Sequence, residues 1–159
     1  MSQSIEFNPD IISKYSTSGP RYTSYPTAVQ FHAGFSQQDY VRKAVGSNQM
    51  DPQRPLSLYF HIPFCNTVCF YCGCNKIVTK HRDRAAPYLQ RLHREIAIQG
   101  KLFNKSRKVE QLHWGGGTPT FISHGEMQAL MDITREHFSL QDEGQGEYSI
   151  EIDPREVEP

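Results

Sequence analysis

Four cysteines within one short segment are the residues whose type and spacing point most clearly to chemistry. They are Cys65, Cys69, Cys72 and Cys74, and the sequence contains no other cysteine. Thiolates are strong ligands for iron and zinc, so a close group of them can bind a metal ion or an iron–sulfur cluster. The clustering predicts a metal centre in segment 65–74 rather than disulfides, which would be spread out to close longer loops.

The arrangement Cys-x3-Cys-x2-Cys, formed by Cys65, Cys69 and Cys72, suits three corners of a [4Fe–4S] cube. Three protein ligands leave one iron free to bind a small molecule, and that open position permits chemistry beyond electron transfer. Cys74 is too close in sequence to reach the fourth corner comfortably, and we expect it to be a small packed thiol, with a redox role as the alternative. Two other interpretations stay open: a zinc-stapled interaction module and a standalone electron carrier, although both usually show other cysteine spacings.

Hydrophobic patterns predict the elements that would position these thiols. A short helix is expected at 10–15, and another is expected to begin at Ser36 and to stop at Gly46. The remaining pattern alternates strand and helix, with expected elements at 56–62, 83–99, 109–114, 123–138 and 148–152. This alternation is typical of an α/β fold with a parallel sheet, in which functional sites lie at the carboxyl ends of strands.

Two features at the predicted strand ends could line such a site. A run of glycines, Gly115 to Gly117, is followed by Thr118, and it would let the backbone approach a ligand and offer its N–H groups. Glu151 lies between two isoleucines in its strand, so its carboxylate faces the opposite side and would need a cationic partner inside a barrel mouth. His61 is a weaker catalytic candidate, because strand histidines such as His61 and His113 are usually structural.

Composition limits the class of protein. Lys and Arg together number 17, as do Asp and Glu, so the formal charge is zero and a general nucleic-acid binder or anionic-membrane binder is not expected. The sequence has no apolar run of about 18 residues that would predict a membrane span. Residues 1–10 lack the apolar core of a secretory signal, and together with the clustered thiols this favours a cytoplasmic protein.

The three-cysteine motif, with Tyr71 directly before Cys72, resembles the signature of radical S-adenosylmethionine enzymes. The resemblance implies a partial (β/α)6 barrel and a [4Fe–4S] cluster whose free iron binds S-adenosylmethionine. One electron from the reduced cluster then cleaves a sulfonium C–S bond and yields a 5′-deoxyadenosyl radical.

Segments 19–27, 58–65, 72–76, 112–120 and 150–156 are similar to the oxygen-independent coproporphyrinogen III oxidase family. This resemblance implies two oxidative decarboxylations that convert propionate side chains to vinyl groups in haem biosynthesis. It covers only the N-terminal portion of that family's chain. We therefore expect an N-terminal extension at 1–55, the first part of a barrel at 56–159 that is truncated after its third strand, and no activity from the isolated chain.

The resemblance also implies a role for individual residues. Cys65, Cys69 and Cys72 would ligate the cluster. The residues that would contact S-adenosylmethionine, of which two molecules are expected, are Tyr59, Tyr71, Gly116, Gly117, Thr118 and Glu151. Arg21 and Lys76 are candidates to bind the carboxylates of the porphyrinogen substrate. A flavodoxin-type protein is the expected electron donor, and a haem chaperone from the same superfamily, without oxidase activity, is the alternative.

Overall fold

The computed structural model of the chain describes residues 7–16, 30–70, 72–142 and 144–156. The chain divides into two compact units, Met1–Gln37 and Gln38–Pro159. The first unit contains helix α1 (Pro9–Tyr15), whose N-cap residue Asn8 accepts hydrogen bonds from the next backbone N–H groups of the helix. This helix confirms the short helix expected at 10–15.

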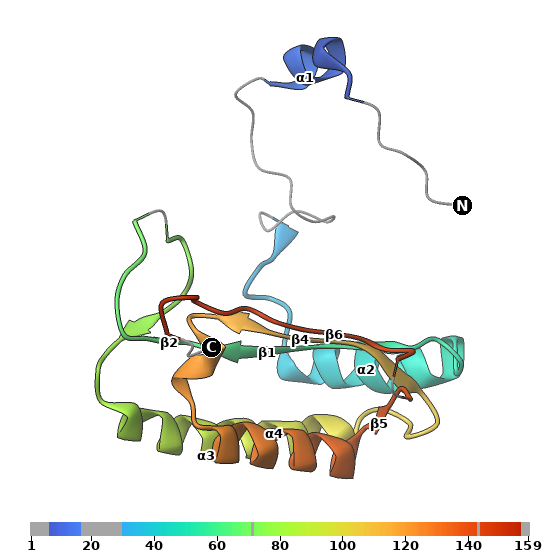
Figure 1. Cartoon of the computed structure of the whole chain (residues 1–159). Helices are drawn as coiled ribbons and strands as arrows, with labels where there is room; N and C mark the ends of the chain where they lie inside the picture. Colours follow the sequence, from blue (N-terminus) through green and yellow to red (C-terminus); the bar gives the residue numbers. More distant parts are fainter. Residues whose placement is uncertain (1–6, 17–29, 71, 143, 157–159) are drawn as a thin grey trace. The chain divides into compact units, whose positions relative to one another are not determined.

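A parallel sheet forms the centre of the second unit (Figure 1). Strand β4 (Lys108–Gly116) pairs along one edge with β1 (Leu56–Ile62), and along its other edge with β5 (Ser139–Leu140) and then β6 (Glu147–Ile150). All of these pairings are parallel, which confirms the predicted α/β class. The register places Tyr59 beside His113 and His113 beside Ser149, so these side chains form one row across the sheet.

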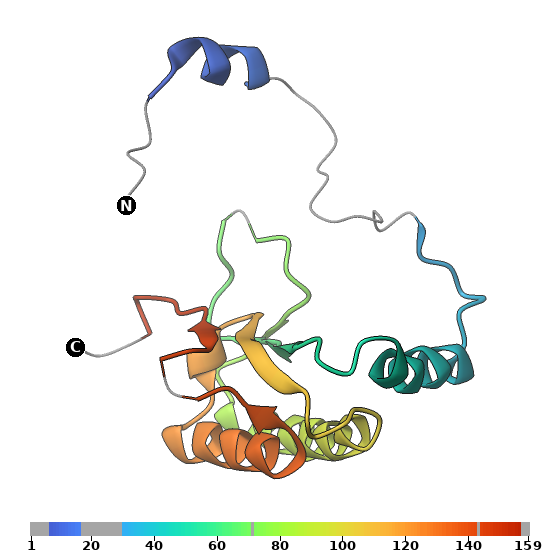
Figure 2. The same ribbon diagram turned by 90° about the vertical axis from the view of Figure 1, so that its right-hand side faces the viewer.

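Two neighbouring helices, α3 (Ala85–Gly100) and α4 (His124–His137), cover one face of this sheet (Figures 1 and 2). The shared core contains apolar side chains from the strands and from both helices, among them Phe60, Ile62, Leu89, Ile96, Leu112, Trp114 and Leu130. Short 3-10 turns, η2 (Arg82–Arg84) and η3 (Pro119–Phe121), precede the two helices. Helix α4 begins with a capping box, in which Ser123 and Glu126 bond to each other's backbone N–H groups.

Helix α2 (Gln37–Met50) is longer than the sequence pattern indicates, because it continues past Gly46. The expected stop at Gly46 is therefore wrong. Asn48, in the added turn, is buried, and its side chain donates to the Leu102 carbonyl at 2.8 Å and accepts from the Asn104 N–H at 3.1 Å. These tertiary bonds favour helix at a position where local propensity favours a stop. Helix α2 belongs to the second unit, and the domain boundary at residue 55 stays a prediction.

Two short strands that the sequence pattern does not reveal close the base of the cysteine loop, which is the segment between them that carries Cys69, Cys72 and Cys74. Strands β2 (Phe64–Cys65) and β3 (Ile77–Val78) pair in parallel, and Thr79 donates its N–H to the Cys65 carbonyl at 2.9 Å. The chain between them projects from the end of the sheet (Figure 2). Within the described part of the chain, no helix is both long enough and apolar enough to cross a lipid bilayer.

Candidate functional site

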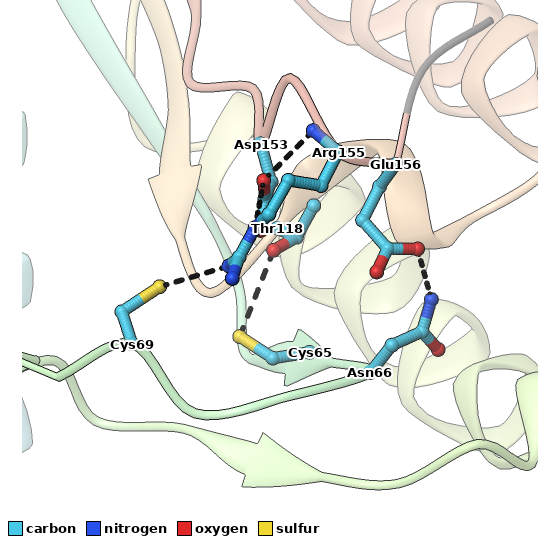
Figure 3. Close-up of polar contacts among 7 residues, drawn as sticks. All are labelled: Cys65, Asn66, Cys69, Thr118, Asp153, Arg155 and Glu156. Carbon is cyan, nitrogen blue, oxygen red and sulfur yellow. Dashed lines mark hydrogen bonds and ion pairs between the residues drawn. The ribbon is translucent and has the colours of Figure 1, made fainter.

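A cavity of about 810 Å³ lies between the cysteine loop and the carboxyl ends of β4 and β6. Seven of the residues predicted for the site line it: Cys65, Cys69, Cys72, Gly116, Gly117, Thr118 and Glu151. The segment after β6 adds Asp153 and Arg155, which the sequence analysis did not select. Figure 3 shows how this segment reaches the loop that carries the thiols. The strand order thus brings together residues from three distant parts of the sequence.

The four thiols are free, and they differ in exposure. Cys65 is buried on β2, Cys69 and Cys72 are half-buried, and Cys74 is exposed. The expectation that Cys74 is a small packed thiol is therefore wrong. The three motif thiols share the cavity, but among the described residues no three Cys, His, Asp or Glu side chains converge closely enough to hold a metal ion. The donor set itself, three free thiols on one loop, has the chemistry that a cluster with one open iron requires.

Hydrogen-bond donors reach the sulfurs of the motif from several directions. The hydroxyl of Thr118 lies 3.7 Å from the Cys65 sulfur, and Nη2 of Arg155 lies 3.5 Å from the Cys69 sulfur (Figure 3). A backbone hydrogen bond from Cys74 lowers the pKa of the Cys72 thiol, and a hydrogen bond from Lys76 adds to this effect. These hydrogen bonds favour the thiolate form of Cys72, and the thiolate is the form of cysteine that binds metal.

The glycine run is explained first by packing within the protein. Gly116 has a φ of +110°, and a Cβ there would lie 2.5 Å from the His61 ring. A Cβ on Gly117 would lie 2.6 Å from the backbone oxygen of Phe64. The end of β4 therefore fits against β1 and β2 only without side chains.

The backbone N–H groups of this run are also satisfied internally. Gly116 donates to Oε2 of Glu151 at 3.0 Å, Gly117 donates to the Ile62 carbonyl at 2.8 Å, and Thr118 donates to the Phe64 carbonyl at 2.8 Å. The glycine run predicts that these N–H groups are offered to a ligand, and the structure uses them inside the protein instead. The run still lines the cavity, so any contact with a ligand has to come from its remaining surface.

An aromatic and polar row leads across the sheet to Glu151. The ring of Tyr59 stacks on that of His113, with centroids 5.7 Å apart and planes 16° apart. His113 then contacts Ser149 Oγ at 2.7 Å and Glu151 Oε1 at 3.5 Å. Burial raises the pKa of Tyr59, and the nearby Glu151 carboxylate raises it further.

Tyr59 and His61 line a separate cavity, of about 370 Å³, rather than the one that contains the thiols. His61 has partners on both ring nitrogens, the Tyr59 hydroxyl at 3.0 Å and the Asn75 carbonyl at 2.8 Å. These bonds fit a structural histidine better than a catalytic one. Lys76 is held in the cysteine loop, where its ammonium group lies 3.4 Å from the Cys74 carbonyl. Tyr71 and Arg21 lie outside the described residues.

The sequence pattern does not predict that the segment 153–156 is part of the site. Arg155 donates to both carboxylate oxygens of Asp153, at 2.6 Å and 2.9 Å, and this pairing lowers the pKa of Asp153 to about 2. Glu156 accepts a hydrogen bond from the side chain of Asn66 in the cysteine loop. The acidic and basic residues of this segment are visible in the sequence, but no periodic pattern indicates that they return to a loop 86 to 90 residues earlier.

Several known proteins are similar to this chain over nearly all of its length. The oxygen-independent coproporphyrinogen III oxidases of Pseudomonas aeruginosa and Escherichia coli are 52% and 48% identical to it over 158 and 156 residues. A relative of the same name from Mannheimia haemolytica is 47% identical over 144 residues, which are 91% of this chain and 94% of that protein. The chain belongs to the oxygen-independent coproporphyrinogen III oxidase family.

The solved structure of the Escherichia coli coproporphyrinogen III oxidase, described as a radical SAM enzyme, superposes on this chain with a TM-score of 0.78. The match has 46% sequence identity and covers 98% of this chain and 33% of that enzyme. The chain likewise spans 34% and 33% of the length of its Pseudomonas and Escherichia relatives in this oxidase family. No family model matches the chain.

Proposed function

We propose that this chain forms the cluster-binding and S-adenosylmethionine-binding part of an oxygen-independent coproporphyrinogen III oxidase. The observation that carries the proposal is the shared cavity, in which Cys65, Cys69 and Cys72 face Thr118 and Glu151 at the carboxyl ends of parallel strands. Cys65, Cys69 and Cys72 would hold a [4Fe–4S] cluster with one open iron, which would supply the electron that splits S-adenosylmethionine into methionine and a 5′-deoxyadenosyl radical. The proposal includes a cytoplasmic location, where thiols stay reduced.

The carboxylate of Glu151 is suited to hold a cationic group of S-adenosylmethionine. Its Oε2 is fixed by the Gly116 N–H, and its Oε1 lies 3.5 Å from the His113 ring. The side chain is 54% exposed and lines the cavity, so an edge of the carboxylate stays accessible to an ammonium group. A charge-assisted hydrogen bond of this kind would orient the ligand beside the thiols.

The other cofactor contacts come from the strand ends and from the cysteine loop. We assign Gly116, Gly117 and Thr118 to the cofactor pocket, with Gly117 and Thr118 also near a second S-adenosylmethionine. Support comes from their position on the wall of the cavity that the thiols also line. Tyr59 and Tyr71 complete the assignment, on the similarity of the motif segments to the family.

The proposed substrate is a porphyrinogen that carries four carboxylates. The 5′-deoxyadenosyl radical would take one hydrogen atom from each reacting propionate. Carbon dioxide would then leave, one electron would pass to an electron acceptor, and a vinyl group would remain. Lys76 and Arg21 are assigned to the substrate because cationic side chains can pair with its carboxylates. A one-electron donor of the flavodoxin type would reduce the cluster.

A chimaera tests this function directly. Residues 1–159 of this chain would replace the matching N-terminal third of the Pseudomonas relative, which is 52% identical over that region. Under anaerobic conditions with S-adenosylmethionine and a reductant, we expect the chimaera to convert coproporphyrinogen III to products with vinyl groups. The same chimaera with Cys69→Ser should form none. A folded, cluster-loaded chimaera that binds haem and makes no vinyl product would instead support the chaperone alternative.

A further inference from the structure

The segment that follows β6 folds back on the cysteine loop and contacts it through two side chains (Figure 3). Nη2 of Arg155 lies 3.5 Å from the sulfur of Cys69. The next residue, Glu156, accepts a hydrogen bond from Asn66 at the start of the loop. Residues separated by 86 and 90 positions in the sequence are therefore tied together beside the thiols.

Hydrogen bonds to Asp153 fix the orientation of the Arg155 guanidinium group beside the Cys69 sulfur. Its Nε and Nη2 both donate to Asp153, at distances of 2.9 Å and 2.6 Å, and the Arg155 N–H also donates to Oδ1 of Asp153 at 3.0 Å. An exposed Asp–Arg pair adds little to stability on its own. This pair also orients the positive charge of Arg155, together with an N–H bond of its Nη2, toward Cys69.

The environment of a cluster sulfur sets how readily the cluster accepts an electron. Hydrogen bonds and positive charge near a ligating sulfur stabilise the reduced, more negative state and so raise the reduction potential. Thr118 supplies a neutral donor to Cys65, whereas Arg155 supplies a charged donor to Cys69. Of these two contacts, the one from Arg155 is expected to affect the potential more.

We propose that Arg155, oriented by Asp153, is a positioning residue that holds Cys69 in place and raises the reduction potential of the cluster. This inference rests on the proposed function in requiring a cluster at Cys65, Cys69 and Cys72. It assigns to a residue outside the cysteine motif an effect on the reduction potential of the cluster. The tie between Arg155 and the loop is a property of the chain itself and can be tested without the cluster.

The first test is a potentiometric titration of the anaerobically reconstituted chain, followed by electron paramagnetic resonance. We expect Arg155→Gln to make one-electron reduction about tenfold less favourable, which corresponds to a fall of about 59 mV. Arg155→Lys keeps the positive charge but loses the paired hydrogen bonds of the guanidinium group to Asp153. The reduction potential of this variant should therefore lie between those of Arg155→Gln and the unchanged chain. Arg135→Gln is the matched control, since Arg135 pairs with Asp132 at 3.6 Å on helix α4 and should leave the potential unchanged.

The second test uses the metal-free chain and hydrogen exchange of the backbone. Loss of the Arg155 contact should speed exchange in the peptide that contains residues 66–70, while Arg135→Gln should not. Unchanged exchange in Arg155→Gln would overturn the positioning role, and an unchanged potential in the loaded variant would overturn the effect on reduction. If the unchanged chain binds no cluster under any condition, the proposed function fails, and the exchange measurement still decides whether Arg155 holds the loop.

Discussion

Gly116 donates its backbone N–H to Oε2 of Glu151 at 3.0 Å, although the two residues are 35 positions apart in the sequence. The bond ties the end of β4 to the segment that leaves β6, and it fixes one edge of the carboxylate. The other oxygen faces His113, and the side chain borders the cavity that contains the thiols. A single carboxylate thus has a structural contact on one side and an accessible edge on the other.

Glu151→Gln separates these two roles. The amide oxygen of glutamine can still accept from Gly116, so the fold should be retained. The negative charge is lost, and affinity of the cluster-loaded chain for S-adenosylmethionine should fall about tenfold or more, because a charge-assisted bond is replaced by a neutral one. Calorimetric titration of the cluster-loaded chain with S-adenosylmethionine measures this affinity. Glu147→Gln, at a carboxylate on β6 that accepts from Gln111 at 2.9 Å, is the control and should bind normally.

Gly117→Ala tests whether the glycine run positions the cysteine loop. The new Cβ would lie 2.6 Å from the Phe64 oxygen, so β2 and its Cys65 must shift. We expect a loss of about 1–3 kcal/mol in the free energy of unfolding, measured by urea denaturation, together with lower iron content after reconstitution.

Gly125→Ala is the matched control for that substitution. A Cβ at Gly125 meets nothing within 4 Å, and the residue lies in helix α4. Its free energy of unfolding should be unchanged or raised by up to about 1 kcal/mol, because alanine favours helix. Equal behaviour of the two variants would show that close packing at Gly117 is not what requires glycine there.

The Asp153 carboxyl should titrate well below its ordinary range. Hydrogen bonds from Arg155 lower its pKa from 3.8 to about 2, so the pairing stabilises the folded chain above about pH 4. This contribution is lost as the pH falls through about 2, when the folded-state carboxyl takes up its proton. An NMR titration of Asp153 measures the effect, and Arg155→Gln should return its pKa toward 3.8. A value near 3.8 in the unchanged chain would mean that the pair does not persist in solution.

Cys74 should be dispensable for assembly of the cluster. Its side chain is exposed, whereas Cys65 is buried on β2 beside the Thr118 hydroxyl. Cys74→Ser should therefore keep the iron and sulfide content of the unchanged chain, and Cys65→Ser should lose most of it. Chemical analysis of both reconstituted variants checks this, and a large loss of iron in Cys74→Ser would mean that the fourth thiol is a ligand.

Elements defined by local pattern were predictable from the sequence. Strand β1 has the expected bounds, and helix α4 begins at the Ser123 and Glu126 capping box, because alternation and capping act over a few residues. Strand β4 runs two residues further than expected, through Gly116, because its glycines pack against β1 and β2. Strand β6 ends at Ile150, two residues early, although Glu151 still donates its N–H to the Trp114 carbonyl.

Features that depend on distant contacts were not predictable in the same way. The two-residue strands β2 and β3 are too short to leave a periodic pattern, and they exist because the ends of the cysteine loop meet. Helix α2 continues past Gly46 because Asn48 finds partners near residue 103. The contact of Arg155 with Cys69 likewise joins residues distant in the sequence, and no local pattern predicts it. The motif spacing predicts which cysteines would be ligands, whereas the long-range contacts around them become visible only in the three-dimensional structure.

The measurement that tests the central claim most directly is electron paramagnetic resonance of the anaerobically reconstituted and reduced chain, with and without S-adenosylmethionine. We expect a cluster signal that shifts when S-adenosylmethionine is added, because three thiolate ligands would leave one iron open. A chain that takes up zinc and no iron would contradict it. So would a cluster signal that S-adenosylmethionine leaves unchanged.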